Sequence, residues 1–337
     1  MAQAPPHPAI ALPPSITFDS IALDTKPTAR LECSQVQAEG DSGYADVLVV
    51  FLNGLVAPQG PWLPVIALIL RHLGASASKP QMLAYDRFGQ GRTIDRDPSD
   101  QEEGKEEGYG HDILDIVRDL RQLISQVTRE RGSRSPKRIV FVANSIGCAI
   151  ARLYAQEYPG TVAGMLLLDT ILANSDFVSV FPDPDGPDFD AGSLPEGVTS
   201  ADLRETRAKC RAIFHPSVKN AEGLDRRSLP TLLPEADRPS LEYKGFGGRA
   251  PFVTVVGHDP DHFARETLLG LKIPIAITMN YLNPAWHRYN EDLTKLTDTG
   301  KASGPIIAKD CGHFIQKDNP VFVAELASKL LGDVVRD

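Results

Sequence analysis

The stretch from Arg138 to Arg152 reads Arg-Ile-Val-Phe-Val-Ala-Asn-Ser-Ile-Gly-Cys-Ala-Ile-Ala-Arg, and it indicates the fold more clearly than any other part of the chain. Its first part, Ile139 to Val142, is an unbroken apolar and partly β-branched run, which is typical of a strand buried on both faces. The residues from Ile146 to Tyr158 follow with the pattern of a helix. Ser145 lies in the short turn between them, with a small residue two positions away on either side. The pattern predicts a sharp turn that exposes a hydroxyl beside the free N–H groups of a helix N-terminus.

The composition is that of an ordinary globular protein. The chain has 337 residues, of which 42% are hydrophobic and 23% are charged. Its 44 acidic and 35 basic residues give a formal net charge of −9, which argues against nucleic acid or an anionic membrane as a partner. The N-terminus has no basic segment followed by an apolar one, so we expect a cytoplasmic protein with no membrane insertion. This agrees with four widely spaced cysteines, which are typical of free thiols in a reducing compartment: Cys33, Cys148, Cys210 and Cys311.

Strand and helix patterns alternate over most of the chain, which predicts βαβ crossovers and a largely parallel sheet. The expected strands are 15–23 and 30–37 as a first hairpin, then 46–53, 81–86, 162–169, 251–257 and 304–309. The expected helices are 61–74, 112–131, 284–297, which Asn283 is expected to cap, and 320–331.

The alternation breaks once, which suggests an insertion. Residues 171–250 contain no clear strand; a helix is expected at 201–214 and a short helix or turn at 224–234. We therefore expect residues 15–170 and 251–337 to form an α/β core, with 171–250 as a mainly helical cap over the carboxyl edge of the sheet. The Pro- and Ala-rich residues 1–14 are expected to form a flexible arm.

A serine nucleophile needs a general base, and the base needs an orienting carboxylate. In open α/β sheets such groups gather at the carboxyl ends of the strands. His313 follows the last expected strand, and Asp259 and Asp261 follow the one before it. Asp259 is the preferred acid because it follows its strand closely and precedes a proline. His258 is an alternative base.

Several motifs together resemble the α/β-hydrolase superfamily, over nearly the whole chain after residue 15. They are Asn53-Gly54, Tyr85-Asp-Arg-Phe-Gly-Gln-Gly-Arg-Thr93, Ala143-Asn-Ser-Ile-Gly147, the 151–169 run that ends in Met-Leu-Leu-Leu-Asp169, and Asp310-Cys-Gly-His-Phe314. The resemblance implies a mostly parallel eight-stranded sheet flanked by helices, a Ser–His–acid triad and a cap domain. Some members place the acid where this chain has Asp169, which is therefore another candidate. Phe214-His-Pro216, Asn283 to Asn290 and Gly312 to Asp318 are similar to fungal cytosolic serine hydrolases of the superfamily.

The resemblance also indicates further site residues. Two backbone N–H groups should form an oxyanion hole, one from Ile146 and one from Leu55 or Val56. Candidates for the substrate pocket are Asn53, Gly54, Asn144, Trp286 and Tyr289.

These features predict a serine hydrolase that cleaves an ester, lactone or related carbonyl of a small, largely apolar molecule through an acyl-enzyme. Position 143 is Ala where the nucleophile turn usually has Gly, which keeps open a lyase or carbon–carbon bond hydrolase acting on a polyketide-like metabolite. A third interpretation is a non-catalytic small-molecule binding protein. The histidines show no metal-binding spacing, so we expect no metal and no cofactor. The protein is expected to be a monomer or homodimer.

Overall fold

The centre of the molecule is an eight-stranded sheet in which most strands run parallel. The computed structural model describes residues 10–40, 43–74, 78–129 and 138–337. The β1–β2 and β2–β4 pairs are antiparallel, and the remaining pairs of this sheet are parallel. The arrangement confirms the predicted fold class and places the carboxyl ends of the parallel strands at one edge. In spatial order the strands are β1 (Thr17–Leu23), β2 (Lys26–Val36), β4 (Gln81–Tyr85), β3 (Val47–Leu52), β6 (Arg138–Ser145), β7 (Val162–Thr170), β9 (Phe252–His258) and β10 (Ala302–Ala308).

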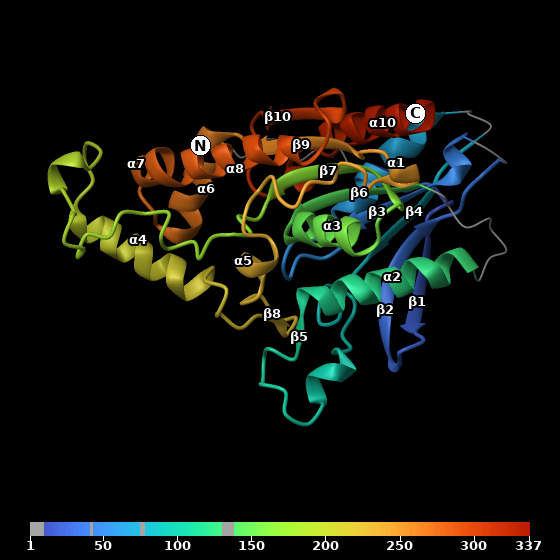
Figure 1. Cartoon of the computed structure of the whole chain (residues 1–337), viewed down its shortest axis with the longest axis horizontal. Helices are drawn as coiled ribbons and strands as arrows, with labels where there is room; N and C mark the ends of the chain where they lie inside the picture. Colours follow the sequence, from blue (N-terminus) through green and yellow to red (C-terminus); the bar gives the residue numbers. More distant parts are fainter. Residues whose placement is uncertain (1–9, 41–42, 75–77, 130–137) are drawn as a thin grey trace.

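Helices cover both faces of the sheet (Figure 1). Helices α1 (Trp62–Leu73) and α10 (Pro320–Arg336) pack on one face, where they meet Val47, Val49 and Phe51 of β3. Helices α2 (Ile113–Arg129), α3 (Ile146–Glu157) and α8 (Asn283–Leu293) lie on the other face and share one apolar core with the alternate residues of β3. Every residue of β3 is fully buried. The strand is therefore apolar throughout because it contributes to two cores.

Residues 171–251 connect β7 to β9 and are called here the β7–β9 segment. It holds α4 (Ser200–Ile213), which extends away from the sheet in Figure 1, and α5 (Leu229–Leu232). No strand is expected there, but β8 (Leu224–Asp225) pairs in parallel with β5 (His111–Asp112). This two-residue pairing has no sequence period, and it ties the segment to the loop that follows β4.

The chain between β9 and β10 is almost entirely helical. Helix α6 (Pro260–Leu271) is followed by α7 (Ile275–Ile277), a π-helical turn (Thr278–Leu282) and α8. The sequence prediction missed α6. It also placed a helix cap at Asn283, where the prediction was wrong, because Asn283 has helical φ and ψ of −57° and −46°. The helix already begins upstream, so the Asn283 side chain has other partners.

The remaining helical elements are short. They are α9 (Ile315–Asp318) and 3₁₀ turns at Gly43–Asp46, Pro98–Gln101, Ala191–Ser193, Phe246–Gly248, Thr294–Leu296 and Thr299–Lys301. Most of the predicted N-terminal arm, residues 1–14, lies outside the described residues. Among the described residues, no helix combines the length and the apolar character that a membrane span requires. The four cysteines are free and buried.

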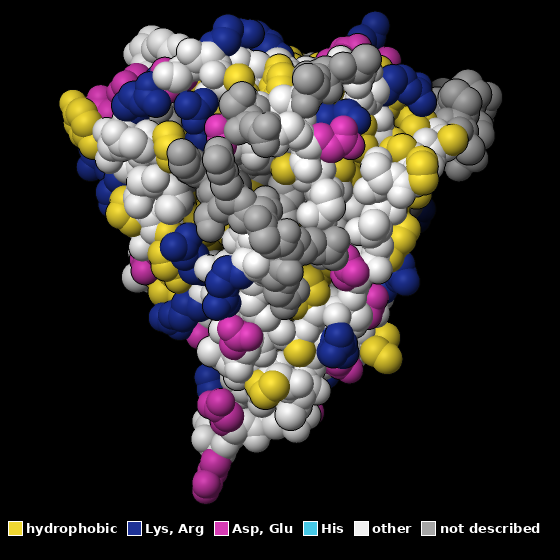
Figure 2. All heavy atoms as spheres, turned by 90° about the vertical axis from the view of Figure 1, so that its right-hand side faces the viewer, with side chains coloured by type: hydrophobic (Ala, Val, Ile, Leu, Met, Phe, Trp, Pro, Cys, Tyr) yellow, Lys and Arg dark blue, Asp and Glu magenta, His cyan; other side chains and the backbone are white. Residues whose placement is uncertain are grey.

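The surface at the end of the molecule opposite α4 shows acidic and basic side chains interspersed with apolar ones (Figure 2). Charges of both signs alternate across the described part of this face, so it presents no large field of one sign.

Candidate active site

Ser145 occupies a strained turn between β6 and α3. Its φ and ψ are 57° and −124°, in a region that residues with a side chain rarely adopt. The turn needs small neighbours, since a Cβ at Gly147 would lie 2.5 Å from the carbonyl oxygen of Leu52. The Ser145 residue is 8% exposed. The geometry presents its hydroxyl at the carboxyl edge of the sheet, as the sequence predicts for this stretch.

His313 reaches a buried carboxylate at the end of β7. Its Nδ1 lies 2.6 Å from Oδ2 of Asp169, whose side chain is fully buried. Burial by itself would raise the pKa of Asp169, but the charge and hydrogen bond of His258 and the hydrogen bond of His313 outweigh it and lower the pKa to about 2. Asp169 is therefore an anion that can hold one tautomer of the His313 ring and stabilise its charged form.

A second histidine shares the same carboxylate. Nδ1 of His258 lies 2.7 Å from Oδ1 of Asp169, and the His258 backbone N–H donates to that oxygen at 3.1 Å. Nε2 of His258 faces Oδ1 of Asn283 at 3.1 Å, so this ring is not directed at Ser145 as an alternative base would be. Burial lowers the pKa of His258, but the charge of Asp169 and its hydrogen bond raise it above the ordinary value.

The structure changes the ranking of the candidate acids. Asp259, the preferred acid in the sequence analysis, is the N-cap of α6 and accepts hydrogen bonds from the backbone N–H groups of Asp261 and His262. Its other oxygen accepts from the Asp310 N–H at 3.0 Å. Burial opposes the shift, but these N–H groups lower the pKa of Asp259. Asp261 lies in the first turn of α6. Of the three aspartates, only Asp169 contacts His313 in the described structure.

The loop after β3 lies directly against the nucleophile. A Cβ at Gly54 would lie 3.3 Å from the Cβ of Ser145. The Val56 N–H is occupied by Oε1 of Glu222 at 2.5 Å, whereas the Leu55 N–H donates to no residue that the structure describes. Ile146 is the first residue of α3, where an N–H has no acceptor within the helix. Leu55, rather than Val56, therefore remains the candidate that could donate beside Ile146 to an oxyanion.

Glu222 fixes this loop from the β7–β9 segment. The Glu222 side chain is fully buried and pairs with Arg87, whose Nε lies 2.7 Å from Oε2. Arg87 in turn donates to the carbonyl oxygens of Asn53 at 3.0 Å and Gly54 at 2.9 Å, and Gln90 joins both Gly54 and Glu222. Burial opposes the shift, but Glu222 raises the pKa of Arg87. Sequence reasoning missed Glu222, because the segment around it has no periodicity and no motif.

Two predicted pocket residues, Asn53 and Asn144, form hydrogen bonds inside the fold. Asn53 donates to the Tyr85 carbonyl at 2.8 Å and accepts from the Trp62 ring N–H at 2.7 Å. Asn144 is fully buried and donates to the carbonyl oxygens of Leu168 and His313. Their side-chain amides therefore satisfy buried backbone groups inside the fold. Asn144 instead joins the nucleophile turn to the loop that carries His313.

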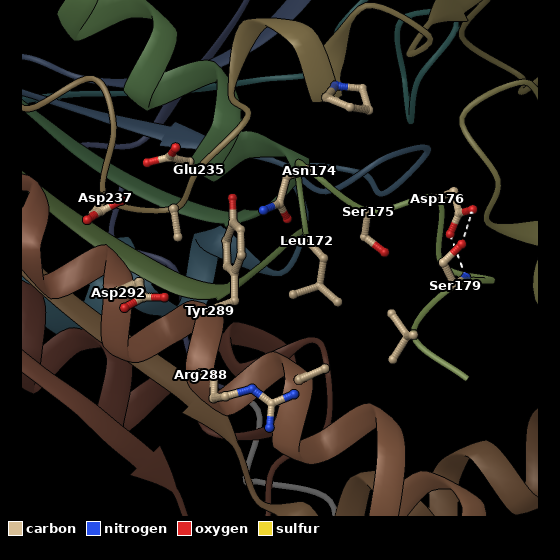
Figure 3. Close-up of a pocket in the computed structure, with 14 residues that line it drawn as sticks. Leu172, Asn174, Ser175, Asp176, Ser179, Glu235, Asp237, Arg288, Tyr289 and Asp292 are labelled. Atoms are coloured by element: carbon tan, nitrogen blue, oxygen red, sulfur yellow. Dashed lines mark hydrogen bonds between the residues drawn. The ribbon is translucent and has the colours of Figure 1, made fainter. Parts of the chain in front are cut away.

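The two aromatic pocket candidates, Trp286 and Tyr289, lie on α8 and face different spaces. The Trp286 ring lies 5.6 Å from the His313 ring, and its N–H donates to the Thr170 carbonyl. Tyr289 points into a cavity of about 800 Å³ between α8 and the β7–β9 segment (Figure 3). Its hydroxyl oxygen accepts from Arg152 at 2.9 Å. The cavity is lined by the carboxylates of Asp176, Glu235, Asp237 and Asp292 and by Arg288, and it includes none of Ser145, Asp169 and His313.

One group of potential metal ligands exists in the described part of the chain. Ligand atoms of His262, Glu266 and Asp318 lie within 4.8 Å of one another. All three residues are at least partly exposed, and Asp318 already accepts a hydrogen bond from the Gly312 N–H. Clusters of this kind are common on protein surfaces without an ion.

Comparison with known proteins agrees with the geometry. The sequence profile of the Alpha/beta hydrolase family matches residues 49–326. A putative lipase from Acinetobacter baumannii is 14% identical with a TM-score of 0.51, over 95% of this chain and 92% of its own. A mutant of the Vigna radiata epoxide hydrolase is also 14% identical with a TM-score of 0.51, over 96% of this chain and 99% of its own. A haloalkane dehalogenase loop variant from Bradyrhizobium elkanii is 15% identical with a TM-score of 0.52, over 95% of this chain and 97% of its own.

At these identities the structural likeness establishes the fold alone. A sequence comparison with curated proteins gives no match. The family profile, however, covers most of the sequence, from β3 to α10. The chain therefore belongs to the alpha/beta hydrolase family.

Proposed function

We propose that this protein is a serine hydrolase that cleaves an ester, lactone or related carbonyl compound, with Ser145 as nucleophile, His313 as base and Asp169 as acid. The observation that carries the proposal is the 2.6 Å contact between His313 Nδ1 and buried Asp169, one strand away from the strained Ser145 turn. Family membership and hydrolases among the structural neighbours support hydrolytic chemistry.

The reaction follows from these positions. His313 takes the proton of the Ser145 hydroxyl as its oxygen attacks the carbonyl carbon. The N–H groups of Leu55 and Ile146 bind the oxygen of the tetrahedral intermediate, and losing one such donor typically costs about 2.7–4 kcal/mol of transition-state stabilisation. His313 then protonates the leaving group, and water attacks the acyl-enzyme by the same route. The structure contains no hydrogen bond between Ser145 and His313; such bonds often tighten only when substrate binds.

The identity of the nucleophile favours carbonyl substrates over alkyl ones. An acyl group on Ser145 forms an ester, which water attacks readily with the same oxyanion stabilisation. An alkyl group would form an ether, which has no carbonyl oxygen for the N–H groups of Leu55 and Ile146 to stabilise. Trp286 beside His313 and Phe314 beside Gly54 give the site an apolar wall, which favours a small, largely apolar substrate. In this proposal residues 171–250 act as the cap of a core formed by 15–170 and 251–337.

The test is a panel of short and long acyl esters and lactones, combined with a fluorophosphonate probe. Wild type should turn over at least one class and be labelled at Ser145; Ser145→Ala and His313→Ala should lose both. Ser193→Ala, an exposed serine of the β7–β9 segment, is the matched control and should behave as wild type. Hydrolysis unchanged in Ser145→Ala would overturn the proposal.

The same variants distinguish the other interpretations. Turnover kept in Ser145→Ala but lost in His313→Ala would indicate the lyase reaction, and an unlabelled, inactive folded wild type would indicate a binding protein. The cytoplasmic location, the monomeric or dimeric state and the similarity to fungal cytosolic members stay predictions.

A further inference from the structure

We infer that His258 is a positioning residue for this reaction: a doubly protonated imidazole that fixes the Asp169 carboxylate toward His313 and offsets part of its negative charge. The inference rests on the proposed triad of Ser145, His313 and Asp169. His258 would touch neither substrate nor nucleophile and would act through Asp169.

The protonation state follows from the partners of the ring. Nδ1 faces the ionised Asp169 carboxylate at 2.7 Å, so Nδ1 must carry a hydrogen. Nε2 faces Oδ1 of Asn283 at 3.1 Å. The orientation of that amide is set by its own donor, because Nδ2 of Asn283 donates to the Pro260 carbonyl at 3.0 Å. A flipped amide would bring two carbonyl oxygens together there. Nε2 must therefore also donate, and a ring with two N–H groups is a cation.

The His258 ring is held in place by aromatic neighbours and by Asp169. His258 is 5% exposed and stacks on Phe263, with ring centroids 4.1 Å apart and planes 25° apart. The Trp286 ring also packs against it in a T-shaped arrangement, with centroids 5.4 Å and planes 85° apart. Since the ring N–H and the backbone N–H of His258 both donate to Oδ1 of Asp169, that oxygen is fully engaged. Oδ2 is left for His313, and the carboxylate plane is fixed.

The charged groups around His258 and Asp169 come from neighbouring strands, from the loop after β10 and from the N-terminus of α6. β7 supplies Asp169, the loop after β10 supplies His313, and Asp259 acts on His258 from the start of α6. α8 contributes the neutral Asn283 and Trp286 to the walls, and α6 contributes Phe263. The positive ring of His258 therefore balances the negative charge that His313 would otherwise meet alone. Without that positive ring, the Asp169 carboxylate would favour the charged form of a neighbouring imidazole more strongly.

The direct test is an NMR titration of the full-length protein labelled with ¹⁵N in the histidine rings. It should be run on Ser145→Ala, so that turnover is irrelevant. Two protonated ring nitrogens should be assigned to His258 by their loss in His258→Asn, and both should persist at pH values above the ~6.5 of an ordinary histidine. A His258 ring with one unprotonated nitrogen at neutral pH would overturn the inference. The result is independent of whether the protein hydrolyses any ester.

The kinetic test separates positioning from packing. His258→Asn keeps a side-chain N–H within reach of Asp169 and removes the charge, and His258→Gln serves if the Asn variant does not fold. We expect kcat/KM at neutral pH to fall by about 10–100-fold, as when partners that orient metal-bound histidines are removed. The acid limb of the pH profile should move up by roughly one pH unit or more. His287→Asn, an exposed histidine on α8, is the matched control. A reduced rate with an unmoved acid limb would mean that His258 only packs, which would refute the charge role.

Discussion

Asp169 lies at the end of β7 and Asp259 directly follows the neighbouring strand β9, yet their carboxylates bind different partners. Asp169 is fully buried and contacts two histidine rings, whereas Asp259 accepts backbone N–H groups at the start of α6. Replacing each aspartate by asparagine should therefore affect turnover at one position and not at the other. Asp169→Asn should lower kcat by about 10⁴-fold, because an amide no longer holds the required His313 tautomer. Asp259→Asn should leave turnover close to wild type, because Asn caps a helix as well as Asp does.

Steady-state kinetics on the two purified variants would decide this prediction, with circular dichroism as the check on folding. A large loss of kcat in Asp259→Asn, together with near-normal turnover in Asp169→Asn, would restore the ranking that sequence alone favoured.

At the residue scale, the serine and the histidine of the proposed triad are those that the sequence predicts, whereas the aspartate beside His313 is Asp169 and not the preferred Asp259. The sequence indicates Ser145 and His313 because each lies in a short motif near the end of a strand. The choice between Asp169 and Asp259 depends on which of two neighbouring carboxylates comes within 3 Å of a ring, and spacing does not encode that distance. One signal was present: Asp259 precedes Pro260, and a cap residue followed by a proline in the first turn is the usual start of a helix.

At the element scale, the loop after β3 and the β7–β9 segment are joined by the buried ion pair of Glu222 with Arg87. Removing one partner of a buried pair leaves the other charge uncompensated and costs about 3–5 kcal/mol. Glu222→Ala should therefore lower the free energy of unfolding by that order. It should also lower kcat, since the Val56 N–H and Arg87 lose the acceptor that holds the loop.

The measurement is urea unfolding together with ester kinetics. Glu205→Ala is the control, because Glu205 forms an exposed pair with Lys209 on α4 and should change stability by less than about 1 kcal/mol. If Glu222→Ala matches this control in both stability and kcat, the pair does not organise the loop.

Among the helices and strands, hydrophobic patterns predict the long buried elements but not the short ones. Strands such as β3 and the amphipathic α2 were predictable because hydrophobic periodicity reports burial directly. β8 was not, because two residues carry no period and pair only after the segment has folded back onto β5. The prediction at Asn283 failed because the helical turns before it continue into α8, and the Asn283 side chain binds His258 instead of capping.

For the whole molecule, the buried carboxylate gives a defined pH dependence. The pKa of Asp169 falls from the ordinary 3.8 to about 2 in the fold, so its contribution to stability is fully present well above pH 3.8 and is lost as the pH falls through 2. A shift of this size corresponds to about 2 kcal/mol. The stability advantage of wild type over Asp169→Asn should shrink by that order between pH ~5 and pH ~2. Urea unfolding of both proteins across this range measures it, and a constant difference would contradict the assigned shift.

The hydrogen bond between Val56 and Glu222 joins residues 166 positions apart. During synthesis it can therefore form only after the chain between them has been made. The ribosome delivers β3, its loop and the Ser145 turn long before the carboxylate that neutralises Arg87. Until residue 222 emerges, the nascent chain lacks the carboxylate that pairs with Arg87 and accepts from the Val56 N–H. The loop beside Ser145 therefore reaches its final contacts only after residue 222 has been synthesised, and strands β9 and β10 of the same sheet follow later still.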